Sequence, residues 1–343
     1  MNLRTLTATF LTITLTAGAA AQSFDAEALA ANLASGETER VQEARDAAVG
    51  YLGNPGLSVS DRLAAVSAID ASVSEAVQSD DEFVAVNALL IAGQFVTPSG
   101  FQVLTEHLDH ETPGVRYAAY RGLRSAFSIL ADQNAPSLQP AAARSAFERL
   151  ADAARSEADA NTLESAYRAL AESLTINAGP LKPLEASAGA SLGRIAGDRV
   201  SSLDGLAEDD YVLTLGSTLY VALEYRRLLG SAGRRFDDET PRAAATLAGE
   251  LIGHAYSQFD AAGGLASIDP DRRELLRQTI STAESVAYLA LGRLGEQAAE
   301  TNLAAAFGNG DDRAFRAGVF RIIGPAGSIP GTGVELQNAP SGE

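Results

Sequence analysis

The sequence contains no cysteine, and it has only three histidines among its 343 residues. Without cysteine the chain has no disulfide bond, no thiol nucleophile and no cysteine to carry a lipid anchor. Its stability must therefore come from packing alone. The small number of histidines limits both histidine-based catalysis and metal binding.

Positive charge is also scarce. The chain has 26 Lys and Arg against 44 Asp and Glu, and its formal net charge is −18. Such acidity opposes nonspecific binding to nucleic acid or to an anionic membrane surface, so we expect no nucleic-acid partner. Lys182 is the only lysine, and nearly every basic side chain is therefore an arginine.

The first hydrophobic run resembles a secretory signal peptide over residues 1–21. Arg4 supplies a positive start, and Leu6 to Leu15 forms an apolar core that is short for a membrane span. The alanines that end at Ala21 fit a cleavage site before Gln22. A buried first helix is the alternative. Because no second span follows, we expect a periplasmic or secreted protein that is not inserted in a membrane after signal removal.

From residue 22 to residue 324 the apolar periodicity predicts helices separated by short breaks rich in Gly, Asp, Ser or Pro. Acidic clusters precede many of these runs, for example Asp80-Asp81-Glu82 and Asp237-Asp238-Glu239. Carboxylates at such positions cap free N–H groups and favour the positive end of a helix. The sequence therefore predicts an all-α fold, in which these carboxylate pairs are caps and not acid–base catalysts.

The stretch from Phe101 to Leu123 contains two apolar helical runs joined by a short turn. The first run ends at Asp109, Pro113 lies in the turn, and Val115-Arg116 opens the second run. This pattern resembles a HEAT repeat, a helical hairpin whose second helix begins with Asp, a short spacer and Val-Arg. Weaker echoes occur around residues 85–90, 166–170 and 287–295.

The resemblance implies a right-handed α-solenoid of stacked helical hairpins, of the HEAT or armadillo type, over residues 22–324. A single hairpin cannot bury its apolar faces, so each must stack on its neighbours. Residues 325–343 contain three Pro and four Gly, which predicts a flexible C-terminal tail. A short peptide ligand for a partner is the alternative for this tail.

The resemblance also places the second helices on the concave face, where Tyr and Arg are typical interface anchors. The candidate protein-binding residues are therefore Arg116, Tyr117, Tyr120, Arg121, Arg124, Tyr167 and Arg168. A structural alternative stays open, in which Arg116 pairs with the Asp109 position between hairpins and alternate tyrosines belong to the core. A second candidate surface comprises Tyr220, Tyr225, Arg226, Arg227, Arg234 and Arg235.

No pattern in the chain indicates catalysis or a resident metal. His107 and His110 are three residues apart, but the second is expected in a polar turn. His254 is expected to be partly buried and hydrogen-bonded. The acidic run from Asp204 to Asp210 lacks the ligand spacing of a calcium loop, and Gly-x-Ser-x-Gly is absent. We therefore expect no metal and no cofactor.

These observations predict an exported, non-catalytic scaffold that binds a protein partner. Two alternatives stay open. One is a hydrolase or lyase built on helical hairpins, which requires Glu250, His254 and Tyr256 to converge with residues of other helices in a cleft. The other is a structural envelope protein that self-associates.

Overall fold

A computed structural model describes residues 24–132, 138–176, 179–234 and 236–340. Over these ranges the chain forms fourteen α-helices and no strand, which confirms the predicted all-α class. The predicted signal peptide, residues 1–21, and its cleavage site before Gln22 lie outside the described residues. None of the helices in these ranges has the length and apolar character needed to cross a membrane.

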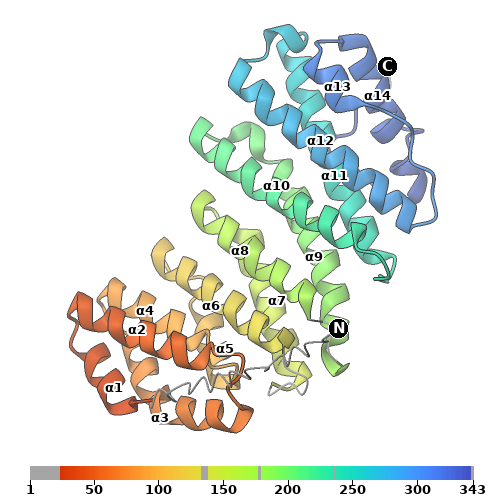
Figure 1. The fold of residues 1–343 in the computed structure, drawn as a ribbon. Coiled ribbons are helices and arrows are strands. Elements are labelled where there is room, and N and C mark those ends of the chain that lie inside the picture. Colours follow the sequence, from red (N-terminus) through yellow and green to blue (C-terminus); the bar gives the residue numbers. More distant parts are fainter. Residues whose placement is uncertain (1–23, 133–137, 177–178, 235, 341–343) are drawn as a thin grey trace, which may run out of the picture.

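The helices follow one another in pairs (Figure 1). The N-terminal pairs are α1 (Ala26–Ala34) with α2 (Thr38–Leu52), α3 (Val59–Val77) with α4 (Glu82–Ala92), α5 (Pro98–Glu106) with α6 (Pro113–Asp132), and α7 (Pro140–Ser156) with α8 (Ala160–Glu172). The C-terminal pairs are α9 (Lys182–Val200) with α10 (Glu208–Gly230), α11 (Glu239–Ala262) with α12 (Pro270–Arg293), and α13 (Leu303–Gly308) with α14 (Asp312–Ile323). Short 3-10 turns are at Ser173–Thr175, Gly179–Leu181, Leu203–Gly205, Leu265–Ser267 and Pro330–Thr332.

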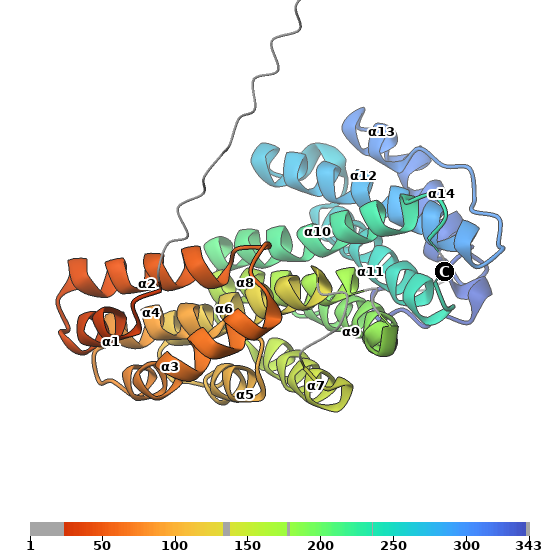
Figure 2. The same ribbon diagram turned by 60° about the horizontal axis from the view of Figure 1, so that its bottom comes forward.

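Neighbouring pairs pack on one another, so that the helices lie in two layers. The second-helix layer contains α2, α4, α6, α8, α10 and α12, each in contact with the next. The first-helix layer contains α1, α3, α5, α7, α9 and α11 in the same way. Figure 2 shows α2, α8, α10 and α12 above α3, α5, α7 and α9.

The last pair reverses this order, because α13 packs on α12 while α14 packs on α11. The connection that follows α12 explains the reversal. Thr301 Oγ1 and the Leu303 backbone N–H donate to the Glu284 carboxylate of α12, at 2.6 and 2.9 Å. The chain is thereby held along α12 and starts α13 in the second-helix layer.

The hairpin predicted from residues 101–123 is confirmed as α5 and α6, with two details changed. The first helix ends at Glu106, three residues before Asp109. Pro113 is the first residue of α6 and does not lie in the turn before it. Proline is tolerated there because the first N–H groups of a helix have no intrahelical partner. The predicted cap at Asp81 is also confirmed, since its carboxylate accepts the Phe83 backbone N–H at 2.9 Å.

The segment that was predicted to be a flexible tail, residues 325–343, packs on the helices in its described part: residues 328 and 329 bond to α14, and residues 332–338 lie against α11. Ile329 is fully buried, and the backbone N–H groups of Gln337 and Asn338 donate to Glu250 of α11. Its Pro and Gly content does prevent a long helix there. A few apolar side chains and one buried acceptor nevertheless hold this non-helical segment in place.

Candidate interaction surface

The seven predicted binding residues do not form one surface, because two of them belong to the core. Tyr120 and Tyr167 are each 0% exposed. They occupy the same place in neighbouring helices, the eighth residue of α6 and of α8. Burial raises the pKa of both hydroxyls above the ordinary tyrosine value. The prediction that these two side chains anchor a partner is therefore wrong, and their repetition reflects packing between pairs.

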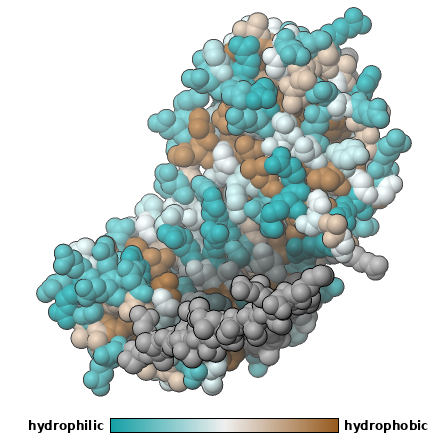
Figure 3. Space-filling model, viewed as in Figure 1, coloured by the Kyte–Doolittle hydropathy of each residue, from teal (hydrophilic) through white to brown (hydrophobic). Residues whose placement is uncertain are grey.

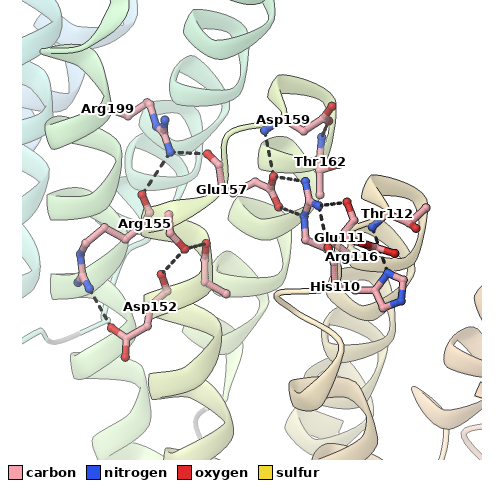
Figure 4. Close-up of polar contacts among 12 residues, drawn as sticks. His110, Glu111, Thr112, Arg116, Asp152, Arg155, Glu157, Asp159, Thr162 and Arg199 are labelled. Carbon is pink, nitrogen blue, oxygen red and sulfur yellow. Dashed lines mark hydrogen bonds and ion pairs between the residues drawn. The ribbon is translucent and has the colours of Figure 1, made fainter. Parts of the chain in front are cut away.

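Arg116 is also occupied, in a contact between adjacent helix pairs (Figure 4). Its Nε and Nη2 donate to the two carboxylate oxygens of Glu157 at 2.9 and 2.8 Å. Its Nη1 donates to the backbone carbonyls of His110 and Glu111 at 2.8 and 3.1 Å. Such a two-pronged pair is a strong, geometrically specific contact. The open structural alternative for Arg116 is thus the one that the geometry favours.

The partner of Arg116 is not the one that the resemblance implied. Glu157 lies in the turn between α7 and α8, its side chain is 1% exposed, and its carboxylate also accepts the Asp159 backbone N–H. Asp109 instead pairs with Arg149 of α7. Glu157 is placed one helix pair further along, and Arg199 of α9 donates to its backbone carbonyl at 2.6 Å. The contacts therefore join three successive pairs (Figure 4).

The other predicted residues lie on the outer face of the second-helix layer. Tyr117 is 39% exposed, and the Arg121 guanidinium lies 5.8 Å from the centre of its ring. Arg124 of α6 pairs with Glu172 of α8 at 3.4 Å. These side chains are in contact with solvent and remain candidates for partner binding.

Arg168 extends this face toward the C-terminal half. It pairs with Glu164 one helical turn earlier, at 2.5 Å, and its guanidinium lies 4.5 Å from the centre of the Tyr220 ring of α10. A cation held over an aromatic face is favourable and keeps both groups in place. The contact therefore joins the outer faces of α8 and α10.

The second predicted surface, by contrast, divides in two. Tyr225 is fully buried and its hydroxyl donates to the Gly189 carbonyl, and Arg234 is held by Glu185 at 2.6 Å. Arg235 lies outside the described residues. The members that are accessible on α10 are Tyr220, Arg226 and Arg227.

Sequence reasoning missed an apolar stripe on the outer face of α10. Val212, Leu213 and Leu223 are 44%, 41% and 37% exposed. Figure 3 shows hydrophobic patches in the middle of this face, among hydrophilic side chains. A signal was present, because apolar residues surround the whole of this helix and one packed face does not require so many.

A groove of about 520 Å³ continues this face beside α12. Arg226, Glu284 and Tyr288 line it, together with residues 298–301 of the connection to α13. Tyr288 is 67% exposed, although it lies in the weaker echo of the repeat around residues 287–295, where Tyr288 takes the place that Tyr120 has in α6. The echo therefore does not extend to burial, and Tyr288 is an aromatic side chain presented to solvent.

His254 is hydrogen-bonded, as predicted, and is more deeply buried than expected. It is 2% exposed, its Nε2 lies 3.0 Å from the hydroxyl of Tyr211, and its Nδ1 lies 3.6 Å from the Asp204 carboxylate. Burial lowers the pKa of His254 to about 4. Tyr211 is 1% exposed, so neither ring is accessible to a substrate in this conformation.

The three residues on which the enzyme alternative depended have separate partners. Glu250 accepts backbone N–H groups of residues 337 and 338, and His254 contacts Tyr211. The hydroxyl of Tyr256 accepts a hydrogen bond from Arg316 at 2.7 Å. His107 and His110 both lie between α5 and α6, and His110 Nδ1 accepts the Thr112 backbone N–H at 3.1 Å. Within the described ranges no group of three or more acidic or His side chains is arranged to hold a metal ion.

Comparison with known proteins gives no family. No family model matches the sequence, and no curated protein matches it. Among solved structures, a crystal structure of an engineered protein matches with 19% identity and a TM-score of 0.34, over 76% of this chain and 97% of that one. A second engineered protein matches with 16% identity and a TM-score of 0.25, over 85% of this chain and 86% of that one.

Proposed function

We propose that this chain is an exported, non-catalytic scaffold, a right-handed HEAT-like α-solenoid that binds a protein partner through its second-helix layer. The packing of each helix pair on the next supports the solenoid. The signal-like residues 1–21 support export. The enclosed positions of His254 and Tyr211 favour a structural role for the cluster that most resembles a catalytic site.

The observation that carries the proposed binding role is the outer face of α10 and α12. It presents the apolar stripe of α10 and Tyr288 of α12, flanked by Arg168 and Arg226. Large apolar and aromatic side chains next to arginines are the residues that dominate binding energy in protein interfaces. Monomeric proteins seldom expose such side chains in a continuous patch.

A pull-down from the native cell envelope tests this role. The bait is tagged residues 22–343, compared with Leu223→Asp and with Leu63→Asp. Leu63 is 45% exposed on α3, in the first-helix layer, so it matches Leu223 in chemistry and exposure. A carboxylate in an apolar interface disfavours binding strongly. We expect one dominant protein with wild type and Leu63→Asp, and at least a tenfold loss with Leu223→Asp. Equal recovery with both variants would overturn the proposed surface.

Self-association is the second candidate for the same exposed apolar face. Sedimentation at several protein concentrations separates it from binding to another protein. A sedimentation coefficient that rises with concentration in wild type and not in Leu223→Asp favours self-association. A monomer at every concentration counts against it.

A further inference from the structure

On its outward face, α11 has a shallow groove where two glycines leave the helix backbone uncovered by side chains. Gly249 and Gly253 are one helical turn apart on this helix. A Cβ on Gly249 would lie 2.6 Å from Leu336, and one on Gly253 would lie 2.3 Å from the Asn338 carbonyl oxygen. Glycine at position 253 is required for this approach, because the nearest atom belongs to the backbone of Asn338, whereas at position 249 the flexible end of the Leu336 side chain occupies the space.

Glu250 stands beside these glycines and engages the segment through its backbone. Glu250 is 2% exposed. One carboxylate oxygen accepts the Gln337 N–H at 2.6 Å, and the other accepts the Asn338 N–H at 3.1 Å. Burial raises the pKa of Glu250, while these two hydrogen bonds act in the opposite direction. A buried carboxylate is costly unless it is satisfied in this way.

The burial of the segment itself alternates along the chain. From Thr332 to Asn338 every second residue is partly covered and the residues between them are exposed. Val334 and Leu336 are the covered apolar members and pack against the core. The alternation means that one side of the segment faces the helix and the other faces solvent, and residues 337 and 338 form a bend at its end.

From this geometry we propose that Gly249, Glu250 and Gly253 form a peptide-recognition groove. Its ligand is a non-helical segment with the pattern Val-x-Leu-x-Asn that bends at its last two residues, and residues 334–338 of the same chain are its occupant. The two hydrogen bonds to Glu250 come from successive backbone N–H groups, so they require a peptide that bends at residues 337 and 338 and not a particular side chain. Leu336 supplies sequence preference, because its side chain lies over Gly249, whereas Asn338 lies over Gly253 through its backbone carbonyl and Cβ. This inference does not depend on the proposed scaffold function.

Occupation within one molecule hides the site from other ligands. A short connection gives a tethered ligand an effective concentration on the order of millimolar. The connection from α14 contains Gly324, Gly327, Gly331 and Gly333, and Gly333 adopts a left-handed φ of 80°. A change within the segment that removes it from the groove should therefore expose a site for the same peptide added from solution.

Leu336→Asp in the full chain provides this change, because it places a charge against the groove. The probe is a fluorescein-labelled peptide with the sequence of residues 331–343, followed by fluorescence anisotropy. We expect binding to Leu336→Asp that is at least tenfold tighter than binding to wild type, whose groove is filled. A peptide that carries the same Leu-to-Asp change should not bind. Absence of peptide binding to Leu336→Asp, with helix content unchanged, would overturn the proposal.

A second variant places the site on α11. Gly253→Ala, combined with Leu336→Asp, should weaken peptide binding at least tenfold, since its Cβ occupies the space of the Asn338 carbonyl. Gly249→Ala should act in the same direction. Peptide binding that is unchanged by both alanines would show that the peptide binds elsewhere.

Hydrogen exchange of the single variant Gly253→Ala gives an independent measurement on an intact tail. We expect amide exchange over residues 334–340 to be at least tenfold faster than in wild type, while α11 stays protected. Equal amide exchange in wild type and Gly253→Ala would contradict the proposed position of residues 334–338 on α11.

Discussion

The buried histidine gives a stability that depends on pH in a predictable direction. In the folded protein His254 stays neutral down to a pH near 4, whereas in the unfolded chain it binds a proton near its ordinary pKa of 6.5. Between these values the unfolded state binds more protons than the folded state. Stability therefore decreases as pH falls through 6.5, and this particular loss is complete below about pH 4.

The magnitude follows from the interval between the two values. From 6.5 to about 4, the pKa difference corresponds to about 3 kcal/mol of folding free energy. About 2 kcal/mol of this is lost between pH 7 and pH 5. Burial is the main cause, because the ring is enclosed between α10, α11 and the start of α12. The nearby Asp204 carboxylate acts against burial, and Arg272 acts with it.

Urea unfolding at pH 7 and pH 5 measures this difference in wild type and in His254→Gln. Glutamine keeps an acceptor for Tyr211 and cannot be protonated in this range. We expect the variant to lose about 2 kcal/mol less than wild type between the two pH values. The comparison cancels other titrations, including that of Glu250. Tyr211→Phe is the matched control, since it removes the hydroxyl and leaves the buried imidazole. An identical pH dependence in wild type and His254→Gln would refute the reasoning.

Three further predictions concern the packing between helix pairs. Glu157→Gln should lower the free energy of unfolding by about 2 kcal/mol in urea, because Arg116 loses its buried charge partner; an unchanged midpoint would contradict the network. Val115→Asp should unfold part of the structure, because Val115 is 2% exposed in α6, and an unaltered melting curve would exclude that packing. Tyr120→Ala should lower the free energy of unfolding by about 3–5 kcal/mol, whereas Tyr117→Ala should lower it by less than about 0.5 kcal/mol. Equal melting temperatures of the two variants would contradict the difference in burial between Tyr120 and Tyr117.

Helices were predictable from the sequence because their causes are local. A carboxylate such as that of Asp81 caps the helix that it precedes, and apolar spacing sets which face is buried. The hairpin of α5 and α6 needed nothing beyond this. For the same reason the all-α class followed from periodicity and caps, without any knowledge of which helices touch.

The candidate surface depended on contacts that spacing does not encode. Tyr117 and Tyr120 are three residues apart, yet one is 39% and the other 0% exposed, since only the neighbouring pair decides which side of α6 is covered. The echo at Tyr288 did not extend to burial, because Tyr288 is 67% exposed and lines a groove with residues 298–301.

Sequence alone determined the helical class, the principal breaks between helices and the acidic caps, all of which act within a few residues. Tertiary structure decided that Arg116 pairs with Glu157, 41 residues away, and that the C-terminal segment lies on Glu250, 87 residues before Gln337. Both contacts depend on which surfaces the stacked helix pairs bring together. Long-range pairing of this kind is set by the packing of the whole chain, whereas periodicity and capping are properties of each segment.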